Sequence, residues 1–363
     1  MTITTELSDL ESLVAVESPS ADLVAVARCA DVVADLGRRA TGAAPERVLV
    51  GERVHLRWQF GRPRVLLLGH FDTVWPIGTL ARWPFEIDGD RVTGPGVFDM
   101  KAGIVQLFAA LSALDDLDGI GILLNSDEEI GSTTSQQLIE DTARDAAAVL
   151  VLEPSSDGAL KVARKGVGMF TVEVTGRAAH AGLEPERGIN ATVEAAHQVL
   201  AISGIGNAEL GTTVTPTVVS AGTTVNTVPA AATVAVDVRA QSAAEMARVD
   251  AALQSLSPQL PGAAVKVVPR SVRLPLERSA SEKLFERART IATHLGLGDL
   301  GGVAVGGGSD GNITAALGVQ TLDGLGAVGG NAHAEGEWAS LSAISQRATL
   351  VSALIRDLLE ASP

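Results

Sequence analysis

Residues 65–72 read VLLLGHFD, and this stretch decides the fold. Its apolar part, Val65–Gly69, is short and uninterrupted, which is typical of a strand that is buried on both faces of a parallel sheet. His70 and Asp72 follow directly after that strand. Ligands bind at the carboxyl ends of the strands in open α/β sheets, so the stretch predicts a buried sheet with a site at its edge.

The sequence around this strand repeats the same pattern. Apolar runs at Ile120–Asn125 and Ala148–Leu152 predict further buried strands. Apolar residues at helical spacing predict a helix over Met100–Leu114 and helices within residues 1–40, the second of them capped by Ser20. Strands that alternate with helices predict an α/β domain with a mostly parallel sheet.

The pattern changes near residue 166. Apolar and polar residues now alternate, which predicts half-exposed strands, and two helices lie between them. The expected order is strand Met169–Thr175, helix Ile189–Ile202, strands Val214–Ser220 and Thr233–Val238, helix Ala243–Leu256 and strand Val265–Val268. This order resembles an α+β ferredoxin-like domain. We therefore expect a discontinuous α/β domain, residues 1–165 and 274–363, with a second domain inserted at residues 166–273.

Composition excludes several classes of protein. The chain has 363 residues, more than one hydrophobic core usually serves. Its formal net charge of −15 disfavours nucleic acid and anionic membranes as partners. One cysteine, Cys29, cannot form a disulfide framework. No signal peptide or membrane-spanning run is visible, so the sequence predicts a soluble, cytoplasmic protein.

Carboxylates gather at the ends of the predicted buried strands. Glu128 and Glu129 follow one such strand, and Glu153 follows another. Asp99 lies just before the predicted helix at Met100. Each has an ordinary interpretation when taken alone, because Asp99 fits a helix N-cap and a glutamate pair fits a solvated turn. Clustered carboxylates repel one another, however, and two divalent cations would remove that repulsion.

A series of motifs runs through nearly the whole chain in order. They are GHFDTV (69–74), GPGVFDMKAG (94–103), DEEIGS (127–132), EP (153–154), GRAAHAG (176–182), VNTVP (225–229), DVR (237–239), GGSD (307–310) and HAEGE (333–337). The series resembles the M20 metallopeptidases, and within them the glutamate carboxypeptidase (carboxypeptidase G2-like) branch. Each motif alone is weak, whereas the ordered series is specific. The stretch Asp323–Gly330 departs most from the family pattern.

The resemblance implies a zinc-hydrolase domain with two Zn²⁺ per subunit, for which Co²⁺ or Mn²⁺ are possible substitutes. It implies that one aspartate bridges the two ions and that each ion has one further histidine and one glutamate. The implied ligands are Asp99 as the bridge, His70 and Glu153 on one ion, and Glu129 and His333 on the other. Asp72 would orient His70, and Glu128 would be the general base.

The resemblance also assigns residues of the inserted domain. His180 would reach the site of the neighbouring subunit in a homodimer formed through this domain, and it would stabilise the oxyanion there. Arg239 would bind the substrate carboxylate, a task that suits the guanidinium fork. Asn226, Arg273 and the backbone at Gly308 would add substrate contacts. In a phosphate-binding loop of the Walker A type, Lys-Ser or Lys-Thr follows the glycines. No such pair follows Gly306–Gly308, so a Walker A site is not expected here.

The function expected is hydrolysis of an amide bond in an N-acyl amino acid or peptide that has a free C-terminal carboxylate. The same metal site would serve a deacylase or a dipeptidase that acts on another small amide. A third interpretation is an inactive binding or scaffold protein. Such a protein would be expected to lack a ligand or the base, and neither is missing from the sequence.

Overall fold

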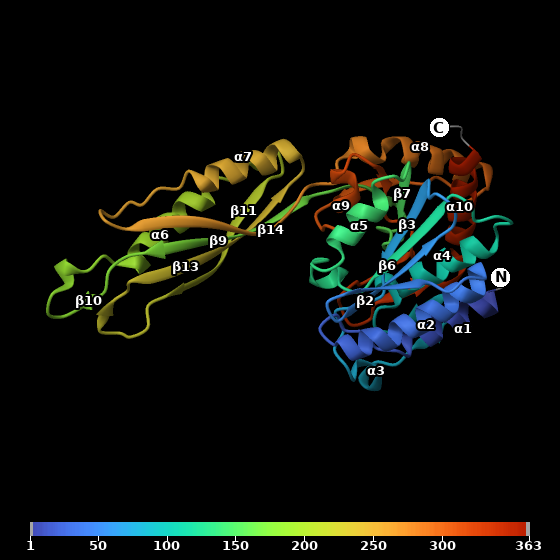
Figure 1. The fold of residues 1–363 in the computed structure, drawn as a ribbon, viewed down its shortest axis with the longest axis horizontal. Helices are drawn as coiled ribbons and strands as arrows, with labels where there is room; N and C mark the ends of the chain where they lie inside the picture. Colours follow the sequence, from blue (N-terminus) through green and yellow to red (C-terminus); the bar gives the residue numbers. More distant parts are fainter. Residues whose placement is uncertain (1–2, 361–363) are drawn as a thin grey trace. The chain divides into compact units, whose positions relative to one another are not determined.

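The run that begins at Val65 forms strand β3 (Val65–His70), which is buried throughout and lies inside a six-stranded sheet (Figure 1). The order of the sheet is β1-β2-β6-β3-β7-β16, with bounds β1 (Glu46–Val50), β2 (Arg53–Gln59), β6 (Ile120–Asn125), β7 (Ala148–Val151) and β16 (Gln320–Leu322). Strands β6, β3, β7 and β16 pair in parallel, and β2 pairs antiparallel with β6. The expected largely parallel sheet is confirmed, and its parallel strands end at one edge.

The structure, a computed structural model, describes residues 3–360 and divides into two units. Unit 1 comprises the described residues within Met1–Ala163, Arg278–Val305 and Ser309–Pro363, and unit 2 comprises Arg164–Glu277 and Gly306–Gly308. Each unit has its own hydrophobic core. Residues 1–2 and 361–363, which the expected domain bounds include, lie outside the described residues.

Helices cover both faces of the sheet in unit 1 (Figure 1). The larger core contains residues of α1 (Ile3–Val14), α2 (Leu23–Thr41), α4 (Ala102–Ser112), α8 (Arg278–His294) and α10 (Leu341–Glu360), and the smaller core those of α5 (Gln136–Ala143) and α9 (Gly311–Ala316). Val65 and Leu67 of β3 join the larger core, whereas Leu66 and Leu68 join the smaller one. Successive side chains of a strand point to opposite faces, so a sheet covered on both faces needs an unbroken apolar run.

Short elements that the sequence pattern did not predict complete unit 1. They are α3 (Thr79–Arg82), β4 (Glu86–Asp88), β5 (Arg91–Thr93), η1 (Val97–Lys101), η2 (Glu128–Ile130), β8 (Leu160–Arg164), β15 (Gly302–Val305), β17 (Gly329–Gly330) and β18 (Trp338–Ser340). Strands β17, β18, β5 and β4 form one small sheet, in which β5 pairs with β18. This pairing brings the chain just before Asp99 beside the chain just after His333. Among residues 3–360 no helix has both the length and the apolar character needed to cross a bilayer.

The start of α2 differs from the prediction. The N-cap is Asp22, whose carboxylate accepts the amides of Val24 and Ala25. Ser20, the predicted cap, instead donates its hydroxyl to Asp72 Oδ2 at 2.7 Å. A side chain far away in sequence thus determines the role of this serine.

The helix predicted from Met100 begins at Ala102. It follows the one-turn segment η1, in which Asp99 and Met100 have non-helical backbone angles, with φ −114° and ψ 95° at Asp99. The residue that precedes α4 is Lys101, which makes no side-chain capping bond. Asp99 is therefore not a helix cap, and its carboxylate is free for another role.

Unit 2 has the expected ferredoxin-like order of elements. These are β9 (Gly166–Thr175), α6 (Ala191–Ser203), β11 (Thr213–Ala221), β13 (Ala231–Ala240), α7 (Ala243–Gln254) and β14 (Ala264–Arg273). The four strands form an antiparallel sheet in the order β11-β13-β9-β14, so β11 and β14 are its edges. The helices pack on one face of this sheet. Beyond the end of β9 lie the short pair β10 (Ala179–His180) and β12 (Thr227–Val228), and η3 (Pro185–Arg187).

Candidate metal centre

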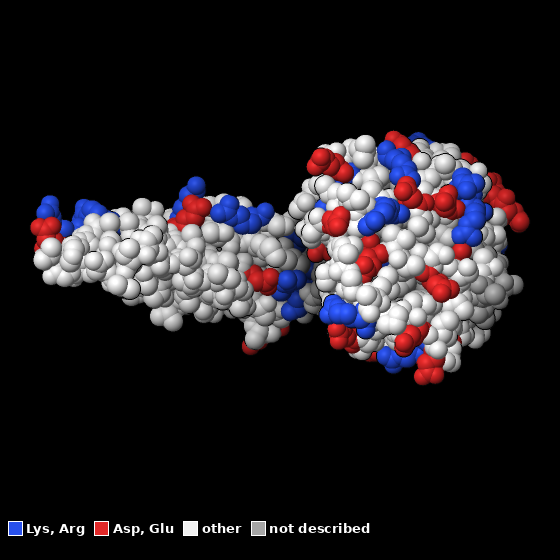
Figure 2. All heavy atoms as spheres, turned by 90° about the horizontal axis from the view of Figure 1, so that it is seen from below, with Lys and Arg blue, Asp and Glu red and all other residues white. Residues whose placement is uncertain are grey.

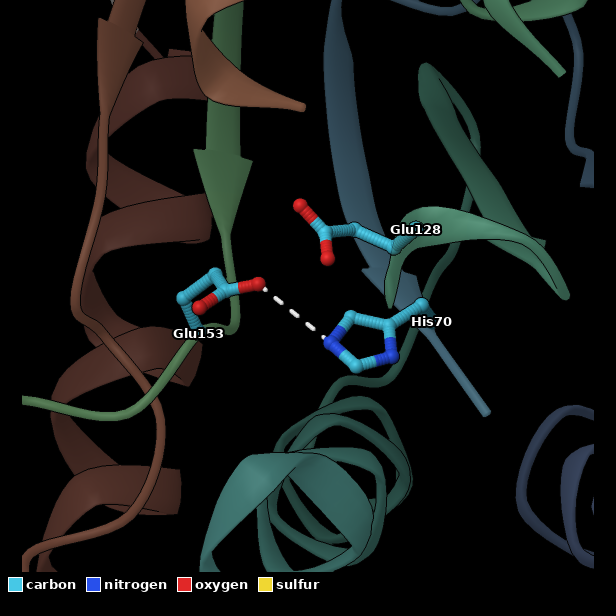
Figure 3. Close-up of side chains that lie close together, drawn as sticks. All are labelled: His70, Glu128 and Glu153. Atoms are coloured by element: carbon cyan, nitrogen blue, oxygen red, sulfur yellow. Dashed lines mark ion pairs between the residues drawn. The ribbon is translucent and has the colours of Figure 1, made fainter. Parts of the chain in front are cut away.

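The ends of the parallel strands in unit 1 bring together charged residues predicted from the sequence. His70 ends β3, Glu128 follows β6 and Glu153 follows β7. Figure 3 shows their three side chains converging from these elements. Ligand atoms of these three residues lie within 4.8 Å of one another, and the same holds for His70, Asp99 and Glu129.

Asp99 lies between two histidines. Its Oδ1 is 3.3 Å from Nε2 of His70, and its Oδ2 is 3.4 Å from Nε2 of His333. Nε2 of His70 is also 3.4 Å from Oε1 of Glu153, and Nε2 of His333 is 3.1 Å from Oε2 of Glu129. Each histidine thus has its own glutamate, and the two histidines share Asp99.

Two buried polar atoms of this cluster have no hydrogen-bond partner within residues 3–360, namely Nε2 of His70 and Oδ1 of Asp99. Buried polar atoms are nearly always paired, so two unpaired atoms that face each other indicate a missing ligand. Imidazole nitrogens and carboxylate oxygens are common ligands of Zn²⁺, Co²⁺ and Mn²⁺. The residues present therefore fit a divalent metal centre.

The clustered carboxylates favour positive charge on both histidines. Burial disfavours a charged His70, but the nearby carboxylates of Asp72, Asp99 and Glu153 outweigh it and raise its pKa. Hydrogen bonds to Asp99 and Glu129 raise the pKa of His333 to about 10. Metal ligation requires neutral histidine, so bound cations would take the place of these protons.

Asp72 holds the turn that carries Glu128 and Glu129. Its carboxylate accepts the amide of Glu128 at 3.3 Å and that of Glu129 at 3.2 Å. Nδ1 of His70 lies 3.0 Å from the carbonyl oxygen of Asp72 and 3.4 Å from its Oδ1. The carbonyl and the carboxylate of Asp72 therefore both face the ring of His70, and the carbonyl is the closer of the two.

Asp310 supports the same turn and was missed as a functional residue. Its side chain accepts hydrogen bonds from the hydroxyl of Ser132 and the side-chain NH₂ group of Asn125. Burial raises the pKa of Glu128, and the nearby charges of Glu153 and Asp310 raise it further. The GGSD motif contained the signal for Asp310, but only the folded chain shows what this carboxylate contacts.

The other predicted site residues belong to unit 2. Nδ1 of His180 accepts the amides of Gly182 and Leu183, each at 3.1 Å. A neutral His180 therefore carries its proton on Nε2, which makes that atom a donor. Asn226 lies on the neighbouring segment, where its carbonyl oxygen accepts the amide of Ala181 at 2.9 Å.

Two arginines flank the first residues of β9. Arg239 on β13 and Arg273 on β14 both pair with Val167. Residues directly opposite in neighbouring antiparallel strands share a face, so both side chains emerge on the same side of the sheet. Arg239 is also paired with Asp237, through Nε–Oδ1 and Nη2–Oδ2 contacts of 3.0 Å each.

Gly308 belongs to a short segment, residues 306–308, that groups with unit 2. The carbonyl oxygens of Gly307 and Gly308 accept Nη1 of Arg164 at 3.2 and 3.3 Å. A Cβ atom added at Gly306 or Gly307 would meet nothing within 4 Å. There is open space beside this backbone, which suits the close approach of a ligand.

The chain is similar to known proteins over most of its length. The model of the peptidase family M20/M25/M40 matches residues 66–357. Carboxypeptidase G2 from Pseudomonas sp. (strain RS-16) is 33% identical over 97% of this chain and 89% of its own. Succinyl-diaminopimelate desuccinylase from Ehrlichia chaffeensis is 29% identical over 33% of this chain and 36% of its own. In fold, the chain matches an M20 family metallo-carboxypeptidase from Sulfolobus solfataricus with a TM-score of 0.75 at 16% identity, covering 97% of this chain and 99% of that one.

Proposed function

The chain belongs to peptidase family M20/M25/M40 and is a hydrolytic enzyme, and from this premise we propose that it cleaves an amide bond next to a free carboxylate. The substrates of this proposal are N-acyl amino acids or peptides with a free C-terminus. The observation that carries the proposal is the cluster in which His70 and His333 share Asp99 while each has its own glutamate.

We propose that this cluster holds two Zn²⁺, or Co²⁺ or Mn²⁺ in their place. Asp99 would bridge them, with His70 and Glu153 on one ion and Glu129 and His333 on the other. Divalent ions polarise a carbonyl group and lower the pKa of water. The unpaired buried atoms of His70 and Asp99 support this assignment.

Glu128 is the general base in this proposal. Its carboxylate lies within 4.8 Å of the ligand atoms of His70 and Glu153. Burial and the neighbouring carboxylates raise its pKa, which suits a group that takes a proton from water and passes it to the leaving nitrogen. Asp72 and Asp310 hold the turn on which it stands, so the base is oriented before the substrate arrives.

We further propose a homodimer in which His180 serves the site of the partner. Within one chain, Arg239 pairs with Val167 at the start of β9, and His180 lies beyond Thr175 at its other end (Figure 1). At about 3.3 Å per residue, the stretch from 167 to 175 spans roughly 26 Å, which exceeds a small amide substrate. Both residues can contact one substrate only if they come from different copies.

Strand β11 is the proposed dimer edge. It contains no charged residue over Thr213–Ala221, whereas β14 carries Lys266, Arg270 and Arg273. Figure 2 shows charged side chains along the margins of unit 2 and few across the face in view. Val218 and Val219 of β11 are 63% and 53% exposed. An uncharged, exposed edge invites pairing, and a two-fold axis would place the same strand of both copies together.

A subunit-mixing experiment tests the shared site. His180→Ala and Glu128→Gln are each expected to inactivate the enzyme when present alone. Mixed under conditions that exchange subunits, they should regain part of the activity, because one site of a mixed dimer has both an intact Glu128 and the intact partner histidine. Proven subunit exchange without any recovery would place the action of His180 within its own chain or remove it from catalysis.

Arg239→Ala is expected to lower kcat/KM for substrates with a free carboxylate, with a loss of ~2 kcal/mol in transition-state stabilisation, the lower end of the usual loss for a broken charged pair. We expect the lower end because the side chain of Arg239 is 32% exposed. Arg239→Lys is the matched control, since it keeps the charge and loses the fork. Amidated substrates should be poor for the wild type and no worse for the alanine variant. Equal turnover of acid and amide by the wild type would favour a general amidase.

A deacylase is the second candidate, because a desuccinylase is among the similar proteins. A dipeptidase would use the same metal centre. Amine release from parallel sets of N-acyl amino acids and dipeptides separates the three activities. No release from any set by the metal-loaded enzyme would place its substrate outside these classes of amide. The cytoplasmic location stays a prediction.

A further inference from the structure

Glu337 is a fully buried carboxylate four residues after His333, with an exposed fraction of 0%. Its two oxygens accept four N–H groups, three of them from the backbone that leads to Asp99. The donors are the amides of Phe98 and Asp99 to Oε1 at 2.8 Å each, and the amide of Gly96 at 3.1 Å and the indole of Trp75 at 2.8 Å to Oε2. This glutamate therefore fixes the path of the loop that ends in Asp99.

Burying a charged carboxylate to hold a loop costs desolvation free energy. Burial raises the pKa of Glu337 to about 7, against the hydrogen bonds to Asp99, Trp75 and Gly96, which lower it. All four partners are donors, so only the carboxylate can accept from every one of them. A glutamine would point its own N–H₂ group at two of these donors, which leaves buried donors unpaired.

Glu337 also ends the loop that presents His333. Asn331 and His333 both have a φ of 61° in this loop. The side chain of Asn331 donates to the carbonyl of Gly336 at 3.3 Å, and the amide of Glu337 donates to the carbonyl of Ala334 at 3.1 Å. Because the loop is closed on itself in this way, a displacement of Glu337 is passed on to His333.

We propose that Glu337 is a positioning residue that sets the spacing between Asp99 and His333, and with it the affinity of the metal position that these two share with Glu129. This inference rests on the proposed metal centre. The other metal position draws its remaining ligands from the ends of β3 and β7, which Glu337 does not contact through any of its four hydrogen bonds. Loss of Glu337 should therefore weaken the two metal positions unequally.

The test is a titration of the metal-free full chain with Co²⁺, followed by the visible absorption of the bound ion. In Glu337→Gln we expect one Co²⁺ to bind as in the wild type and the other to bind about 10–100-fold more weakly, the usual effect of losing a group that orients a ligand. Glu337→Asp keeps the charge but is too short to reach all four donors. It provides the same comparison, with a smaller loss, if the glutamine variant does not fold.

Glu194→Gln is the matched control. Glu194 is also 0% exposed, and its Oε2 accepts the amides of Gln259 at 3.0 Å and Leu260 at 2.7 Å. It belongs to unit 2, which contributes none of the proposed metal ligands. We expect Glu194→Gln to lower the melting temperature of the metal-free chain and to leave both Co²⁺ affinities unchanged.

The outcomes separate this inference from the proposal beneath it. If the wild type binds two Co²⁺ and Glu337→Gln leaves both affinities unchanged, or weakens them equally, the positioning role of Glu337 is overturned. The two-metal centre itself would stand. The same unequal loss in Glu194→Gln would make it a general consequence of lost stability and would also overturn the positioning role. A wild-type chain that binds no second Co²⁺ overturns the two-metal centre, and the role of Glu337 with it.

Discussion

Glu128→Gln is expected to lower kcat by at least ~10²-fold, the smaller end of the usual contribution of a general base, while the metal content stays unchanged. Glutamine keeps the shape of the side chain and cannot accept the proton of the attacking water. The turn that carries the residue should survive, because its supports from Asp72 and Asp310 bond to the backbone of Glu128 and Glu129 and to the side chain of Ser132. Steady-state kinetics and elemental analysis of the same sample provide both measurements.

Glu129→Gln is the matched variant for this prediction. It is expected to lose metal first and activity as a consequence, because the residue faces His333 at 3.1 Å. The comparison is needed because Glu128 also lies within ligand distance of His70 and Glu153. If Glu128→Gln loses metal and Glu129→Gln keeps it, Glu128 is the ligand and Glu129 is the base.

Removal of metal is expected to abolish activity, and Zn²⁺ or Co²⁺ should restore it. Without cations, nothing in the centre would polarise the substrate carbonyl or lower the pKa of the attacking water. Elemental analysis of the restored enzyme should find about two metals per chain, as in other two-metal sites. The melting temperature should rise with added metal, since an ion that binds only the folded chain stabilises it.

Two controls make the chelation result specific. Mg²⁺ added to the chelated enzyme should restore little activity, because it prefers oxygen ligands and waters over imidazole. The chelator should have no effect on the rate once it is saturated with Zn²⁺. Full activity in a sample shown to be free of metal would contradict the proposed chemistry.

The large buried elements could be predicted because their pattern is local. Strands β3, β6 and β7 are short apolar runs, and the alternation in β9 and β13 follows from a sheet covered on one face. Strands β5 and β18 have three residues each, too few to show any period. Their pairing with each other joins segments about 245 residues apart, which a local pattern cannot show.

The backbone around Asp99 could not be predicted for the same reason. The local pattern favoured a helix from Met100, and the helix breakers Gly94, Pro95 and Gly96 lie ahead of Asp99 and do not specify its non-helical backbone. The amide of Asp99 is held by Glu337, 238 residues further on. Ser20 is a second case, because its expected capping role is replaced by a hydrogen bond to Asp72, 52 residues away.

The motifs predicted which residues carry charge near the strand ends, but not how each carboxylate is used. Asp72 was expected to orient His70, and it does lie beside Nδ1 of that ring, but its carboxylate also accepts the backbone amides of Glu128 and Glu129. Asp310 had no predicted role although its motif was recognised. Hydrogen bonds between distant segments determine these roles, and a single sequence does not contain them.

The order in which the centre is synthesised follows from where its residues lie in the chain. Four of the five proposed ligands have left the ribosome soon after Glu153, but His333 comes 180 residues later, with Glu337 just behind it. At roughly 5–20 residues per second, this gap lasts on the order of 9–36 s. During that interval the nascent chain has the carboxylates of the centre without its second histidine or the glutamate that spaces it. On the proposed metal centre, a newly made chain would be able to load metal fully only after His333 and Glu337 have been synthesised.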